Sequence, residues 1–193
     1  MITIIGNGES RKTINVDNIK DMKVGCNGIY LYHSVDLLCA MDKFWREKIV
    51  KESKIPLLSR HINNAYQPTL EIYNGKWNNV KCPYRGYCSG TTALDYICSQ
   101  YKDDIYLIGF DFDYNGEFVN HIYKNTPNHP KENRPAQNEN IFLNETIEII
   151  RRYPKHNIFW VTNSDYNNTI YEKYRVKIKT ITIEEYKNLA YSF

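Results

Sequence analysis

The first eleven residues constrain the fold of this chain more than any other stretch. Residues 2–5 are apolar or β-branched, which is typical of a strand buried on both faces of a parallel sheet. Gly6 and Gly8 follow at once and permit a tight turn in which the backbone comes close to a ligand. Ser10 is a residue type that caps helices, so a helix is expected there. A strand, a glycine turn and a helix N-terminus together predict an anion site, usually for phosphate, although an ordinary strand-to-helix turn has the same pattern.

Strands and helices alternate along the rest of the chain. Strands are expected at residues 22–26, 35–41, 55–59, 104–109, 157–161 and 177–182, with an edge hairpin around Asn74-Gly75. Helices are expected from Ser10 to about residue 20, at residues 42–53, 91–101 and 139–152, and from residue 183. This alternation predicts an α/β fold with a mostly parallel sheet and helices on both faces. The polar stretch 123–138 has the composition of a lid or a disordered loop.

Composition narrows the classes of protein. The chain has 193 residues, of which 42% are apolar, so one folded domain spanning residues 1–193 is expected. The net charge of +3 is compatible with a nucleic-acid acceptor but does not indicate one. Five cysteines without a Cys-x-x-Cys pair indicate reduced thiols, and neither a signal peptide nor a membrane-spanning run is expected. These features predict a cytoplasmic protein.

Polar residues follow several of the expected strands. Because ligands of parallel α/β sheets bind beyond the carboxyl ends of the strands, these residues are the candidate site. They are Asn7, Gly8, Asn27, Asp42, Ser89, Gly90, Asp111, Asp113 and Tyr114. Arg85 lies just upstream of Ser89 and Gly90, where a helix is expected to begin. Its guanidinium could bind phosphate or carboxylate through two hydrogen bonds.

Each candidate also has a simpler structural interpretation. Asn7 and Asn27 could hold a phosphate, a ribose or a base edge, or only shape their turns. Asp42 has the position of a plain helix cap. Asp111 and Asp113, two residues apart, would point the same way in an extended chain and could hold a divalent metal. The alternative that we favour is that Asp111 is buried and accepts backbone amides.

A base that activates an acceptor hydroxyl would most naturally be a histidine. His129, inside the polar stretch, is the first candidate and His121 the second. The sequence lacks Gly-x-Ser-x-Gly, His-Glu-x-x-His and any Cys/His cluster with metal-ligand spacing. The common hydrolases and zinc enzymes are therefore disfavoured.

Four short motifs resemble a known family of enzymes. Ile-Ile-Gly-Asn-Gly-Glu-Ser at the start, Cys26-Asn27, Ser89-Gly90 at a helix start and Leu-Ile-Gly-Phe-Asp-Phe at residues 107–112 look like the bacterial sialyltransferases of glycosyltransferase family 42. The motifs are similar also to the 6-hydroxymethylpterin diphosphokinase-like family. The resemblance covers about residues 1–165, in the same order.

This resemblance implies a single Rossmann-like, glycosyltransferase-A-like domain that uses a CMP-sugar without an essential metal. It would place Asn7, Gly8 and Ser10 near the donor phosphate and Asn27 near the nucleotide. Ser89 and Gly90 would contact the donor, and Tyr114 lies near the place of a phosphate-binding tyrosine. Asp42 falls where the family has an asparagine.

Three functions follow as hypotheses. The first is a glycosyltransferase that moves a sugar from a nucleotide-activated donor to an acceptor hydroxyl, with His129 as base and Tyr114 stabilising the leaving phosphate. The second is a diphosphokinase-like phosphotransferase that needs Mg²⁺ and carboxylates such as Asp42, Asp111 and Asp113. The third is a module that binds a nucleotide without turnover. The donor sugar, the acceptor and the oligomeric state are not determined by the sequence.

Overall fold

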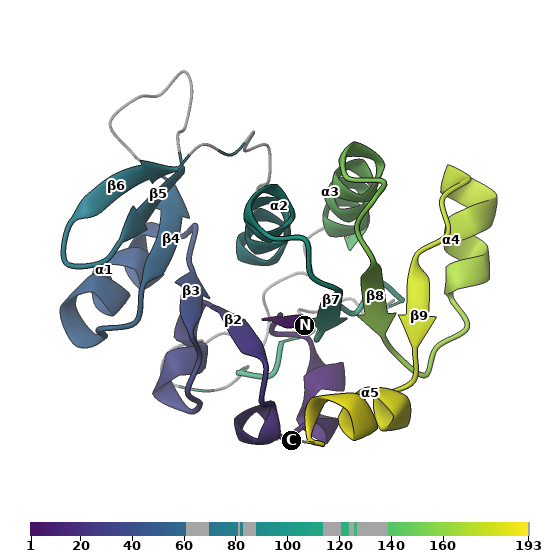
Figure 1. The fold of residues 1–193 in the computed structure, drawn as a ribbon, viewed down its shortest axis with the longest axis horizontal. Helices are drawn as coiled ribbons and strands as arrows, with labels where there is room; N and C mark the ends of the chain where they lie inside the picture. The colour runs from purple at the N-terminus through teal and green to yellow at the C-terminus, as the bar shows by residue number, and fades with distance from the viewer. Residues whose placement is uncertain are drawn as a thin grey trace.

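The computed structural model describes residues 1–60, 70–80, 82, 88–113, 121–123, 126 and 139–192. Within them the chain forms nine strands: β1 (Ile2–Ile5), β2 (Met22–Cys26), β3 (Leu37–Cys39), β4 (Leu57–Arg60), β5 (Leu70–Tyr73), β6 (Trp77–Val80), β7 (Ile105–Ile108), β8 (Ile158–Val161) and β9 (Lys179–Ile181). They build one sheet in the order β6-β5-β4-β3-β2-β1-β7-β8-β9 (Figure 1). All neighbours are parallel except β4–β5 and β5–β6. The expectation of an α/β fold with a mostly parallel sheet is confirmed.

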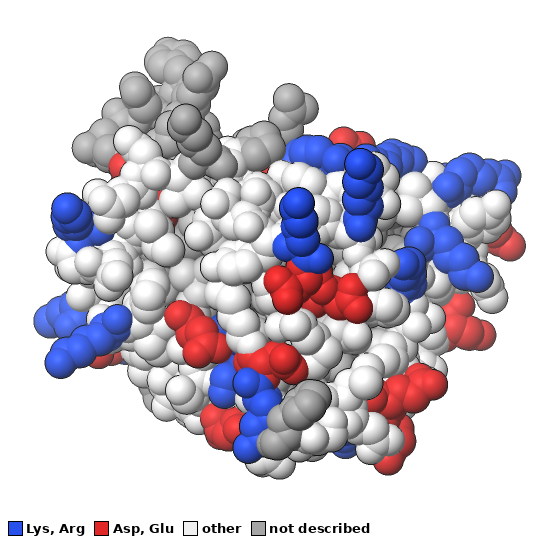
Figure 2. Space-filling model, in the orientation of Figure 1, with Lys and Arg blue, Asp and Glu red and all other residues white. Residues whose placement is uncertain are grey.

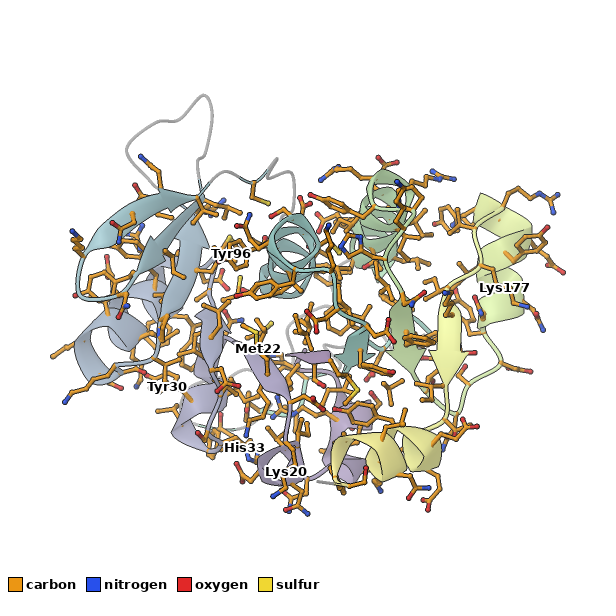
Figure 3. The ribbon with its side chains drawn as sticks, viewed as in Figure 1. Lys20, Met22, Tyr30, His33, Tyr96 and Lys177 are labelled. Atoms are coloured by element: carbon orange, nitrogen blue, oxygen red, sulfur yellow. The ribbon has the colours of Figure 1, made fainter. Side chains whose placement is uncertain are left out.

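Helices cover both faces of this sheet. They are α1 (Lys43–Glu52), α2 (Ser89–Gln100), α3 (Glu139–Arg152), α4 (Asn167–Tyr174) and α5 (Ile183–Ala190), with short 3-10 helices η1 (Glu9–Thr13), η2 (Val16–Asn18) and η3 (Asn27–Leu31). α2, α3 and α4 lie on one side, and α1, α5 and the 3-10 helices lie on the other (Figure 1). Figure 3 shows the same division in side chains, with Tyr96 from α2 on the first side and Tyr30 and His33 on the second.

Each face of the sheet carries its own hydrophobic core. Ile4 of β1 belongs to the same core as Leu94 of α2 on one face, while its neighbour Ile5 belongs to the core that contains Trp45 of α1 on the other. All four residues of this central parallel strand are therefore buried, and three of them are isoleucines. The fourth, Thr3, is polar, and its hydroxyl hydrogen-bonds that of Tyr186.

The strand order reverses direction at β1. The chain runs from β1 outward through β2, β3 and β4, returns through α2 to β7 on the other side of β1, and then runs outward to β8 and β9. The carboxyl ends of β1 and β7 thus diverge into connections on opposite faces. In open α/β sheets this is where ligands bind.

The expected helix after Ser10 is wrong. The chain forms η1 and η2 instead, and Gly8, not Ser10, precedes η1, without a side-chain cap. β-branched residues in this segment disfavour an α-helix. Asn15 also breaks it, because its side-chain oxygen accepts a hydrogen bond from the amide of Asp17, two residues on.

Of two further elements, the hairpin was expected from the sequence and helix α4 was not. The hairpin around Asn74-Gly75 is confirmed as β5 and β6, and Gly75 has the φ of +77° that its turn requires. α4 was not expected, because its first residues, Asn167 and Asn168, are poor helix formers.

Charged side chains are unevenly spread on the face seen in Figure 2. Lysine and arginine side chains gather over α3 and α4, at the upper right of the view. The last turns of both helices carry basic residues, namely Arg151, Arg152 and Lys173, and cations stabilise the negative end of a helix dipole. Among the helices described, none is long and apolar enough to cross a membrane.

Candidate functional site

Asn27 and Ser89 join the carboxyl end of β2 to the start of α2. The hydroxyl of Ser89 donates to Oδ1 of Asn27 at 2.9 Å and accepts the backbone amide of Met41 at 3.2 Å. Asn27 has a φ of +53°, a left-handed conformation that few residues other than glycine adopt. The side-chain oxygen Oδ1 of Asn27 is thus engaged by Ser89. Its Nδ2 has no hydrogen-bond partner among the described residues, so this group is available to a ligand.

Asn7, at the end of the neighbouring strand β1, is held in a similar way. Its Oδ1 accepts from Nη1 of Arg11 at 3.2 Å. Its Nδ2 lies 3.5 Å from the carbonyl oxygen of Cys26, at the long limit of a hydrogen bond. The backbone oxygen of Asn7 accepts the amide of Ile122 at 2.8 Å, which ties residues 121–123 to the end of β1.

Arg11 is a buried cation at this site, with 2% of its surface exposed. Besides Asn7 it donates to the carbonyl oxygen of Gly6 at 3.0 Å and to the hydroxyl of Tyr123 at 2.7 Å. Its guanidinium also lies 5.1 Å from the centre of the Tyr123 ring, which stacks on Tyr32. Burial raises the pKa of Tyr123, although the charge of Arg11 acts in the opposite direction. Tyr123 therefore stays a neutral phenol at neutral pH.

The glycine turn that follows β1 already holds a carboxylate of the chain itself. Asp111 accepts hydrogen bonds from the backbone amide of Ser10, at 3.2 Å, and from its hydroxyl. The amide of Gly8 donates to the carbonyl oxygen of Gly109 at 2.9 Å. A Cβ atom on Gly8 would lie 2.6 Å from the Asp111 carboxylate, so only glycine permits this approach. Asp111 thus accepts a loop amide, as the favoured interpretation expects, but it is only partly buried, so the expected burial is wrong.

The remaining candidates are placed as follows. Asp42 is the residue before α1, as expected, but it is exposed and its side chain caps nothing. Asp111 and Asp113 lie in a chain that turns at residues 112–113, so the expected extended geometry of this pair is wrong. Gly90 lets α2 pass close to Phe110, whose ring a Cβ would approach to 3.0 Å. In the described residues, no group of three acidic, histidine or cysteine side chains is arranged to hold a metal.

Three expected site residues, Arg85, Tyr114 and His129, lie outside the described residues, as does most of the expected lid. His121, the second candidate base, is described. The amide of Tyr123 donates to its Nδ1 at 3.2 Å, so a neutral His121 ring carries its proton on Nε2. At that nitrogen His121 is a hydrogen-bond donor.

The thiols next to the site are poor nucleophiles. Cys88, which precedes α2, accepts the amide of Thr91 at 3.3 Å. Burial raises the pKa of Cys88 to about 11. Burial also raises the pKa of Cys26. Reactive cysteines have lowered pKa values, so these thiols do not fit covalent catalysis.

Sequence reasoning missed Arg11 and Tyr123. Arg11 lies in a polar segment between two hydrophilic residues, where an exposed side chain is the normal outcome. Its partner Tyr123 is 112 residues away, so no local pattern links them. No protein-family model, no curated protein and no solved structure matches the chain, so the resemblance to the family 42 sialyltransferases stays a prediction.

Proposed function

We propose that this protein binds a nucleotide-activated sugar at the carboxyl ends of β1, β2 and β7 and transfers the sugar to an acceptor hydroxyl. The observation that carries the proposal is the pair of asparagines at the ends of two adjacent strands. In both side chains the carbonyl oxygen is engaged by a donor of the protein, Arg11 for Asn7 and Ser89 for Asn27. The amide N–H groups that remain suit oxygen acceptors such as those of a phosphate or a pyrimidine base.

The position and the chemistry of these groups support one another. Asn7 follows β1, the strand at which the order reverses, and Asn27 follows the adjacent strand β2. α/β sheets bind nucleotides beyond the strand ends near such a reversal. N–H donors held in place beforehand stabilise the negative charge that develops on a leaving phosphate, without a cost of reorientation. In this proposal the sugar leaves the nucleotide phosphate as the acceptor oxygen attacks its anomeric carbon. His129 takes the hydroxyl proton and Tyr114 assists the phosphate, as the family resemblance implies.

A thermal-shift panel tests the proposal. The purified chain is heated with cytidine, uridine and adenosine nucleotides and with CMP- and UDP-sugars, each with and without Mg²⁺. Stabilisation grows with the logarithm of ligand concentration over Kd, so at 100 times Kd the donor adds about 2.7 kcal/mol and stands out. A shift with a nucleotide sugar in the absence of metal, followed by release of the nucleotide when acceptors are added, is the expected result. A shift with ATP only in the presence of Mg²⁺ would indicate the phosphotransferase, and binding without release would indicate a module that only binds.

Asn27→Ala should weaken nucleotide binding by about 10- to 100-fold, the range expected for one lost hydrogen bond to a charged acceptor. Titration calorimetry with the ligand selected by the panel measures the change. Asn18→Ala is the matched control, because it removes the same group from an exposed position on η2. Equal affinities of Asn27→Ala and the unmodified chain would remove the main support for the proposed site.

A further inference from the structure

We infer that the anionic group of the ligand lies between Asn7 and Asn27, and that Arg11 is the positioning residue that turns Asn7 toward it. This inference rests on the proposed function and adds to it the place of the negative charge. It differs from the expectation for the glycine turn, where a phosphate would bind the first amides after Gly8.

The burial of Arg11 is the first step. A guanidinium removed from water is unfavourable unless an opposite charge or a full set of hydrogen bonds compensates it. The partners of Arg11 in the described part of the chain are a carbonyl oxygen, an amide oxygen and a phenol, all of them uncharged. Its positive charge is therefore not neutralised by an ion pair there, and it favours an anion close by.

The second step is the orientation of Asn7. A guanidinium can only donate hydrogen bonds, so the Asn7 atom that faces Arg11 must be Oδ1, and Nδ2 must point the other way. Among the residues that the structure describes, Nδ2 is within hydrogen-bond distance only of the carbonyl oxygen of Cys26, at 3.5 Å, and Cys26 directly precedes Asn27. Arg11 thus presents the N–H groups of Asn7 on the side of β1 where β2 ends.

The third step excludes the glycine turn. Asp111 already accepts both the amide and the hydroxyl of Ser10, and Gly8 donates to Gly109. A phosphate placed there would have to displace a carboxylate and would meet its negative charge. Between Asn7 and Asn27 it meets two N–H donors with the Arg11 cation behind one of them.

The test compares two single-charge deletions that are one residue apart. Arg11→Gln removes the buried cation, and Lys12→Gln removes an exposed one whose partner is Glu9. The probes are cytidine and CMP, with uridine and UMP and with adenosine and AMP in parallel, titrated by calorimetry. They isolate the phosphate, because the members of each pair differ only in that group.

In the unmodified chain and in Lys12→Gln, the nucleotide should bind more tightly than its nucleoside by the same ratio. In Arg11→Gln this ratio should fall by about 10- to 100-fold while nucleoside binding changes little. A general loss of structure would weaken both probes together, so the ratio separates positioning from folding. If Arg11→Gln does not fold, Tyr123→Phe replaces it: this variant keeps the charge but removes the 2.7 Å bond that holds the guanidinium, and a smaller fall of the same ratio is expected.

Two results would overturn the inference, and they differ in what they leave standing. An unchanged nucleotide-to-nucleoside ratio in Arg11→Gln, or in Tyr123→Phe where that variant replaces it, would refute the role of Arg11 while the proposed function stands. An unmodified chain that binds none of the six probes and no nucleotide sugar would overturn the proposed function itself, and the inference with it.

Discussion

Asp95→Asn is expected to lower the free energy of unfolding by about 3 kcal/mol. Asp95 on α2 is 1% exposed and accepts two hydrogen bonds from Nη1 of Arg152 on α3, at 2.8 and 2.7 Å. Partial burial acts to lower the pKa of Arg152, but its interactions with the Asp95 carboxylate and with Tyr153 together raise it. The substitution leaves the guanidinium cation without its counter-charge between two packed helices. Breaking one side of a buried pair costs about 3–5 kcal/mol, and the partial exposure of Arg152 favours the lower end.

Urea denaturation followed by circular dichroism measures this change. Glu47→Gln is the matched control, because it also converts a carboxylate into an amide, but in an exposed pair with Lys43 at 3.8 Å. It should cost less than about 0.5 kcal/mol. The double variant Asp95→Leu/Arg152→Leu should recover most of the loss, since two apolar side chains leave no unpaired charge. A loss in Asp95→Asn no larger than that in Glu47→Gln would mean that water replaces the ion pair without cost.

The parts of the fold that sequence predicted are those whose signal is local. β1 and β7 are runs of four buried residues, and a strand covered on both faces is almost continuously apolar. α4 lacked such a signal. Its first residue, Asn167, is held by tertiary contacts, because its side-chain amide donates to the carbonyl of Ile178 and accepts the amide of the same residue. Contacts of this kind override weak helix propensity and leave no trace in a sequence window.

The site residues also differ in whether their role has a local signal in the sequence. Asn7, Asn27 and Ser89 were candidates because each follows a strand or begins a helix, and the structure joins Asn27 to Ser89 directly. The roles of Arg11 and Asp111 depend on partners about one hundred residues away. In particular, the sequence of the first turn predicts an anion, and the chain supplies one itself in the carboxylate of Asp111. A motif thus indicates the kind of group that a turn binds, but not whether that group belongs to a ligand.

Gly109→Ala should destabilise the chain by about 3 kcal/mol and weaken ligand binding as well. Gly109 directly follows β7 with a φ of +66°, and an added Cβ would lie 2.9 Å from the carbonyl oxygen of Gly6, at the end of β1. A left-handed conformation costs an L-residue about 1–2 kcal/mol, and crowding a packed contact adds about 1–3 kcal/mol. Both sides of this contact are backbone, so relief requires the ends of β1 and β7 to separate. That movement would displace Asn7.

Gly75→Ala is the control that separates the cost of the left-handed backbone conformation from the cost of crowding between β1 and β7. Gly75 has a similar φ, +77°, in the β5–β6 turn, and an added Cβ there would meet nothing within 4 Å. It should cost only about 1–2 kcal/mol and leave nucleotide affinity unchanged. The difference between the two variants in urea denaturation measures the close approach of β1 and β7 alone. Equal losses would mean that the strand ends adjust freely, and the strand-end geometry would then not be what holds Asn7 in place for a ligand.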